Sequence, residues 1–159
     1  MVRRSPLATA ALILSLAFGG LVPGAQAAYH SHDHHGSLEQ LRLNQGQKWI
    51  TDAPLRKGME GIRADLAANI DKIHDNSLTP SQYAALADKL NGHVQYMVKN
   101  CQLPKEADDQ LHLVLFEVLS GAERMKSGDD SQAGAVQVVG ALTAYGQYFK
   151  HPNWKPLAH

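Results

Sequence analysis

Residues 79–104 read TPSQYAALADKLNGHVQYMVKNCQLP, and this stretch decides the fold. It opens with Thr79-Pro80-Ser81-Gln82, a capping box with proline at the first helical position. Side chains that suit a protein core then recur at spacings of three and four, which places them on one face of a helix. The residues of this stripe are Tyr83, Leu86, Leu90, His93 or Val94, Met97 and Cys101. The pattern predicts an amphipathic helix of about 20 residues that ends before Pro104.

Three further segments carry the same helical period. Asp52 is the expected N-cap of the first, Pro104 opens the next, and the last follows the capping residues 129–131 and ends at Pro152. Their apolar stripes are Leu55, Met59, Ile62, Leu66, Ile70 and Ile73; Ala107, Leu111, Val114, Val118, Ala122 and Met125; and Ala135, Val138, Leu142, Tyr145 and Phe149. Short connections favour antiparallel neighbours. The sequence therefore predicts an all-α fold, an up-down-up-down antiparallel four-helix bundle over residues 54–151.

The first 27 residues have the pattern of a signal peptide. Arg3 and Arg4 provide a positive start, residues 8–21 are apolar, and Ala25-Gln26-Ala27 is a small-x-small cleavage signal. The apolar run is shorter than the ~20 residues that a membrane-spanning helix needs. We therefore expect export to the periplasm with cleavage near Ala27, and no membrane attachment of the mature form.

Residues 28–53 are predicted to form an exposed, histidine-rich arm, and residues 152–159 a C-terminal tail. The histidines of the arm are His30, His32, His34 and His35. Cleavage after Ala27 would make His30 the third residue, so that the terminal amine, two amides and one imidazole supply the planar nitrogen set that Cu(II) and Ni(II) prefer. Alternatively, the arm is a polar linker. Metal binding by these imidazoles should weaken below pH ~6.5, where they protonate.

A second group of metal ligands is predicted at one end of the bundle. His93, Met97 and Cys101 are spaced by one helical turn each, while Met59 and His112 come from neighbouring helices. We expect the methionines in one layer and the two histidines in the next. Thiolate, thioether and imidazole ligands together select Cu(I). The alternatives are that the methionines only fill the core, that the thiol is inert, and that His112 is a surface residue.

Two stretches resemble a known family. Residues 55–63 and 144–148 are similar to the soluble b-type four-helix-bundle cytochromes of the periplasm. That family holds haem between a methionine of its first helix and a histidine near the end of its fourth. Met59 matches the methionine, and Gly146 stands at the histidine position. The resemblance supports the bundle fold and implies haem b as an alternative cofactor, held through Met59 with His93, His112 or His151.

A broader resemblance covers most of the mature chain. The blocks at residues 43–56, 100–112 and 145–154 resemble a group of small proteobacterial periplasmic proteins, often labelled DnrO-like. This resemblance implies periplasmic location and fold more than activity. It marks Met59, Cys101 and His112 as candidate functional positions.

Composition narrows the functional classes. The chain has 15 basic and 15 acidic residues, so its charge favours neither nucleic acid nor an anionic membrane as a partner. No serine-histidine-aspartate arrangement, phosphate loop or Glu-x-x-His pattern is found, and we expect no enzyme. The single cysteine can form a disulfide only between chains, as in a homodimer. The leading prediction is a periplasmic copper-binding or copper-handling protein. The alternatives are a haem-b carrier or sensor, and a non-metal interaction module that docks a periplasmic partner through an exposed surface around Trp49 and Trp154.

Overall fold

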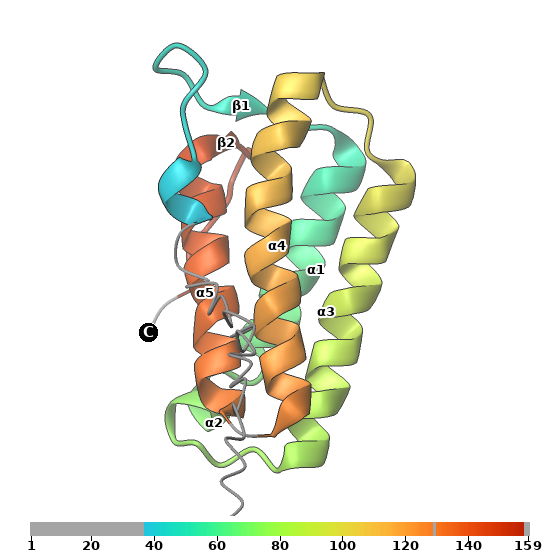
Figure 1. Cartoon of the computed structure of the whole chain (residues 1–159), viewed down its shortest axis with the longest axis vertical. Coiled ribbons are helices and arrows are strands. Elements are labelled where there is room, and N and C mark those ends of the chain that lie inside the picture. Colours follow the sequence, from blue (N-terminus) through green and yellow to red (C-terminus); the bar gives the residue numbers. More distant parts are fainter. Residues whose placement is uncertain (1–36, 129, 158–159) are drawn as a thin grey trace, which may run out of the picture. The chain divides into compact units, whose positions relative to one another are not determined.

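The computed structural model describes residues 37–128 and 130–157, and four long helices dominate it (Figure 1). These helices are α1 (Ala53–Ala67), α3 (Pro80–Asn100), α4 (Lys105–Ser127) and α5 (Ser131–Tyr148). The shorter elements are η2 (Leu38–Gln40), α2 (Ile70–His74) and the two-residue strands β1 (Trp49–Ile50) and β2 (Phe149–Lys150). The prediction of an all-α fold is confirmed at this level. The signal peptide and the four histidines at positions 30–35 lie outside the described residues.

Two of the predicted helix starts form as expected. The Asp52 side chain accepts a hydrogen bond from the backbone N–H of Leu55, and Thr79 and Gln82 form a reciprocal capping box. The start of α5 differs, because the Asp130 side chain caps no backbone N–H. Its carboxylate binds Arg124 instead, at 2.8 Å.

The first predicted helix is broken in two. Its apolar stripe continues through Ile73, but α1 ends at Ala67 and α2 begins at Ile70. Asn69 lies at the break, where its side-chain amide donates to the backbone carbonyl of Asp65 at 2.9 Å. Asparagine competes in this way with the backbone pattern of a helix. Ile73 is nevertheless buried, so the stripe reaches the core across the break.

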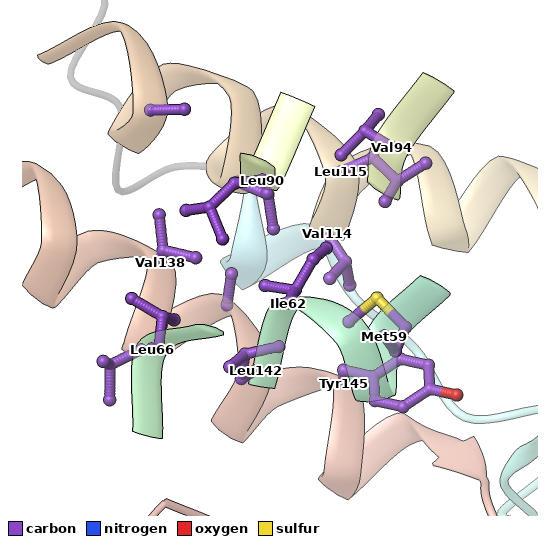
Figure 2. Packing of buried hydrophobic residues seen from close by; sticks show 14 of the residues in the cluster. Met59, Ile62, Leu66, Leu90, Val94, Val114, Leu115, Val138, Leu142 and Tyr145 are labelled. Carbon is purple, nitrogen blue, oxygen red and sulfur yellow. The ribbon is translucent and has the colours of Figure 1, made fainter. Parts of the chain in front are cut away.

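The apolar stripes of the long helices meet in one core. Helix α4 packs against both α3 and α5, and α1 packs against α3. Figure 2 shows side chains from all four helices converging, among them Met59, Leu90, Val114 and Leu142. Helices α4 and α5 approach closely where glycines face each other. A Cβ added at Gly121 would lie 2.6 Å from a backbone oxygen of α5, so a larger residue does not fit there.

The segment before α1 is not simply an exposed arm. Leu41 is only 5% exposed and belongs to the core. Strand β1 pairs in parallel with β2, placing Trp49 opposite Phe149. Residues 42–48 do form an exposed turn, with positive φ at Gln45 and Gly46. Leu41 and strand β1 therefore attach this segment to the bundle, although most of its described residues, including Ile50, are exposed as predicted. Two-residue strands are too short to leave an alternating pattern in the sequence.

The residues after α5 also pack against the bundle. Leu157 is buried in the core, and the Arg63 side chain donates to the backbone carbonyl of Lys155 at 2.5 Å. Within the described residues, no helix has the length and apolar character needed to cross a membrane.

Candidate metal site

Asp52 ties the start of α1 to the end of α3. One carboxylate oxygen accepts from the N–H of Leu55 at 2.8 Å, and the other accepts from the N–H of Gln102 at 2.7 Å. Cys101, the residue before Gln102, is the C-cap of α3, and its own N–H donates to the carbonyl of Met97 at 2.8 Å. The thiol is therefore held at a fixed position beside a carboxylate.

A hollow of about 200 Å³ opens next to Cys101, between the end of α3 and the first turns of α4. We call it the α3–α4 hollow. Its lining residues are Met97, Val98, Cys101, Asp108, Leu111, His112 and Leu115. Three predicted ligands therefore surround one space, and they offer a thioether, a thiol and an imidazole. Asp108 was not predicted as part of this site, although its position four residues before His112 on a helix was a usable signal.

Met97 forms the deep wall of the hollow. It is 1% exposed and packs over Gly58 of α1. A Cβ added at Gly58 would lie 2.5 Å from the Met97 sulfur. The glycine therefore provides the space that the thioether occupies.

Cys101 is half-buried and strongly biased toward the neutral thiol. Burial, the Asp52 carboxylate and the charge of Asp108 together raise the pKa of the Cys101 thiol to about 12. At neutral pH the thiol keeps its proton and is hydrogen-bonded to Asp52. A metal ion that binds the sulfur as a thiolate must displace that proton.

His112 stands at the open rim of the hollow, with its side chain 68% exposed. Its Nδ1 lies 2.9 Å from the backbone carbonyl of Asp108 and 3.5 Å from that residue's carboxylate. A proton on Nδ1 that is donated to this carbonyl leaves the Nε2 lone pair available. This arrangement is common for metal-binding histidines. Among the described residues, no hydrogen-bonding partner contacts Nε2.

Met59 and His93 do not line this hollow. Met59 is fully buried in the core beside Tyr145 (Figure 2). The Nε2 of His93 lies 2.9 Å from the Asp65 carboxylate, and its ring packs over Gly61, so His93 faces α1. The expected imidazole layer of His93 and His112 is therefore wrong, because an acidic partner on α1 holds one of the two rings.

The structure does not place the other predicted metal ligands, the four histidines of the arm. His30, His32, His34 and His35 lie outside the described residues. In the described part of the chain, no three histidine, cysteine, aspartate or glutamate side chains cluster closely enough to hold a metal ion. An ion in the α3–α4 hollow would therefore depend on the methionine, or on a ligand from elsewhere.

A second polar cluster lies between α1 and the end of α5, and we call it the His151 cluster. His151 Nδ1 lies 3.0 Å from the Tyr145 hydroxyl, and Nε2 lies 2.9 Å from a Glu60 carboxylate oxygen. Burial raises the pKa of Tyr145 well above its usual range, so the hydroxyl stays protonated and donates to Nδ1. Nε2–H then donates to Glu60. Both ring nitrogens of His151 are engaged, and its side chain is only 2% exposed.

The two tryptophans that the sequence suggested as a docking surface are both partly packed against the bundle. The Trp49 indole donates to the carbonyl of Arg42 at 2.6 Å. Trp154 packs edge-on against Tyr145, with ring centroids 4.9 Å apart, and lies over Gly146. Both side chains are half-buried. Both tryptophans are thus only partly exposed, and a docking surface around them stays a prediction.

No protein family, curated protein or solved structure matches this chain. The resemblances drawn from sequence motifs stay predictions. The chemistry of the α3–α4 hollow and of the His151 cluster is the remaining basis for a functional proposal.

Proposed function

We propose that this chain is a periplasmic copper-binding protein, built as an up-down-up-down antiparallel four-helix bundle that holds Cu(I) in the α3–α4 hollow. The observation that carries the proposal is the shared lining of that hollow by Met97, Cys101 and His112. Thioether, thiolate and imidazole form a donor set that favours Cu(I) over harder cations.

The surroundings of the hollow favour a cation. The carboxylates of Asp52 and Asp108 both act on Cys101, and their negative charge lowers the energy of a positive ion at the sulfur. Met97 is buried, whereas His112 is exposed. An ion in this hollow would therefore be shielded on one side and open to exchange on the other, as copper handling requires.

Haem b has less support than copper. The methionine that the cytochrome resemblance singles out, Met59, is enclosed by core side chains. Gly146 of α5 is covered by the Trp154 indole, and a Cβ added at Gly146 would lie 2.6 Å from the indole nitrogen. A haem bound between these positions would require that the core and Trp154 move apart.

The test is an anaerobic Cu(I) titration in competition with a chromogenic chelator such as bicinchoninate. The wild-type protein should bind tightly, and Cys101→Ser, Met97→Leu and His112→Ala should each weaken binding. Loss of an outer partner of a metal site typically costs 10–100-fold in affinity, so loss of a direct ligand should cost at least about tenfold. Leucine nearly conserves the volume of methionine, so the fold should survive.

Matched controls come from the same chain. Met125 is fully buried in α4 and does not line the hollow, so Met125→Leu repeats the change at position 97 without touching a proposed ligand. His74→Ala serves in the same way for His112. Binding weaker than about 10 μM in the wild type would exclude specific copper handling. Equal affinity in all three ligand variants and both controls would remove the hollow as the site.

A further inference from the structure

A pocket of about 300 Å³ lies between α2 and the start of α5, two elements that are side by side in Figure 1. We call it the α2–α5 pocket, and its lining residues are Ile70, Ile73, His74, Gln132, Val136 and Val139. A Cβ added at Gly134, in the same turns of α5, would lie 2.6 Å from the backbone oxygen of Gly121 on α4. Gly121 follows Asp108 of the α3–α4 hollow by 13 residues, which corresponds to ~20 Å along α4. The two sites are therefore at different levels of the bundle.

The pocket is held in shape by one side chain at its rim. The Gln132 amide nitrogen donates to the backbone carbonyls of Ile73 and His74, at 2.8 Å and 3.2 Å. These carbonyls belong to the last residues of α2, which is a separate helix because α1 ends at Ala67. The two hydrogen bonds fix the end of α2 on α5. The pocket is therefore formed before any ligand enters, as is usual for binding sites of small molecules.

The walls of the pocket are aliphatic, and part of them faces water. Ile73 and Val139 are buried, Ile70 is half-buried, and Val136 is 57% exposed. An apolar molecule that covers this concave surface removes it from water, which favours binding. A cavity of roughly 150 Å³ lined by aliphatic and aromatic side chains binds benzene. The volume of the α2–α5 pocket therefore suits a molecule of one or two rings.

The polar groups of the pocket favour an uncharged ligand with one hydrogen-bonding group. No aspartate, glutamate, lysine or arginine is among the lining residues. An ionised group in the pocket would lose hydration without gaining an oppositely charged partner. The His74 side chain is exposed at the rim, and among the described residues no hydrogen-bonding partner contacts its ring. Its imidazole can therefore pair with a hydroxyl or amide of the ligand.

We propose that the α2–α5 pocket binds a small, uncharged molecule of one or two rings that carries one hydrogen-bonding group. The rings lie among the four aliphatic side chains, and the polar group pairs with His74. This site is separate from the proposed copper site and does not depend on it.

The test is a titration with three two-ring probes, followed by two-dimensional NMR of the backbone amides. 2-Naphthol should cause saturable shifts confined to α2 and the first turns of α5, with a dissociation constant below about 1 mM. Naphthalene lacks the hydroxyl and should bind several-fold more weakly. 2-Naphthoate carries an ionised carboxylate at neutral pH and should bind at least tenfold more weakly than 2-naphthol. His74→Leu should remove the difference between 2-naphthol and naphthalene.

Variants that fill the pocket localise the binding. Val136→Trp adds bulk at an exposed position of the mouth, so it should spare the fold and weaken 2-naphthol binding at least tenfold. Ile70→Phe does the same from the opposite wall. Leu119→Trp is the matched control, because Leu119 is an exposed side chain of α4 that does not line the pocket. Its affinity for 2-naphthol should equal that of the wild type. Circular dichroism shows whether each variant keeps its helices.

Three outcomes would overturn the inference. The first is the absence of saturable shifts with millimolar 2-naphthol, and the second is equal affinity in Val136→Trp, Ile70→Phe and Leu119→Trp. The third is a dimer that Val136→Trp disrupts and that binds no probe, since a second copy would then occupy the pocket. Cu(I) affinity should be the same in Val136→Trp as in the wild type, so failure here leaves the copper proposal standing.

Discussion

His151 and His112 lie in opposite environments. The ring of His151 is enclosed, with a tyrosine hydroxyl on one nitrogen and a carboxylate on the other. His112 is mostly exposed and uses only Nδ1, leaving Nε2 without a partner among the described residues. An imidazole binds a metal through a free lone pair. The comparison indicates that His151 contributes to the stability of the fold, and it is the reason why we propose His112 rather than His151 as a metal ligand.

The His151 cluster and the α3–α4 hollow differ in the same way as their two histidines. The His151 cluster satisfies its own polar groups, so a ligand there would have to displace existing hydrogen bonds. The α3–α4 hollow is instead lined by a thiol, a thioether and an exposed imidazole. Changes in the hollow should thus alter binding and leave stability nearly constant, whereas changes in the His151 cluster should do the reverse.

The largest expected effect is the pH dependence of Cu(I) affinity. Binding releases the Cys101 proton, and the pKa of this thiol is about 12, so the thiol is protonated across the accessible range. Each unit of pH lowers the competing proton concentration tenfold. The Cu(I) affinity should therefore rise about a thousandfold from pH 7 to pH 10. Competition titrations at several pH values measure the slope.

Cys101→Ser is the control for this slope. Without the thiol, no proton has to leave a sulfur ligand, so the affinity should depend far less on pH between 7 and 10. A flat profile in the wild-type protein would mean that the sulfur does not bind the ion as a thiolate.

The next largest expected effect is a difference in the unfolding free energy that is lost when each of the two histidines is replaced. His151→Ala removes a buried ring, leaves the Tyr145 hydroxyl unpaired, and should lower the free energy of unfolding by about 2–3 kcal/mol. His112→Ala should change it by no more than about 0.5 kcal/mol, as expected for a surface position. Urea unfolding measures both values. Equal losses in the two variants would remove the distinction between the regions.

Local signals made the helices predictable from sequence. The capping residues Asp52 and Thr79 act within a few positions of themselves, and both form as expected. The break at Asn69 and the pairing of β1 with β2 were missed. The first depends on which backbone group one asparagine side chain binds, and the second joins segments about a hundred residues apart in the sequence.

The candidate site was predicted in part for the same reason. Met97 and Cys101 share a helix, so their spacing alone indicated a common wall. His93 also fits that spacing, but Asp65 on another helix holds its ring. The contact of Asp52 with the end of α3 spans 50 positions, and no local pattern signals it. Sequence reasoning thus found Met97 and Cys101 from their spacing and His112 from the expected meeting of helix ends, but it could not tell that Asp65 holds His93.

A smaller effect is expected from Tyr145→Phe. The change keeps the ring, which stacks on Phe149 with centroids 5.2 Å apart, and removes only the hydroxyl. His151 Nδ1 then lacks its donor inside the protein, which should cost about 1–2 kcal/mol of unfolding free energy. Cu(I) affinity should not change, because Tyr145 does not line the hollow. An altered affinity would show that the two regions are coupled.

The smallest expected effect distinguishes the two tryptophans. Within the described residues, the Trp154 indole nitrogen is buried without a hydrogen-bond partner, whereas the Trp49 nitrogen donates to the carbonyl of Arg42. Phenylalanine at position 154 loses some packing but also removes an unsatisfied donor, so the two contributions offset each other within about 1 kcal/mol. Trp49→Phe removes a formed hydrogen bond and should cost more, about 0.5–1.5 kcal/mol beyond the packing loss. Urea unfolding of both variants gives the comparison. A larger loss at position 154 than at position 49 would mean that the Trp154 indole nitrogen does donate a hydrogen bond, to a ligand or to an ordered water.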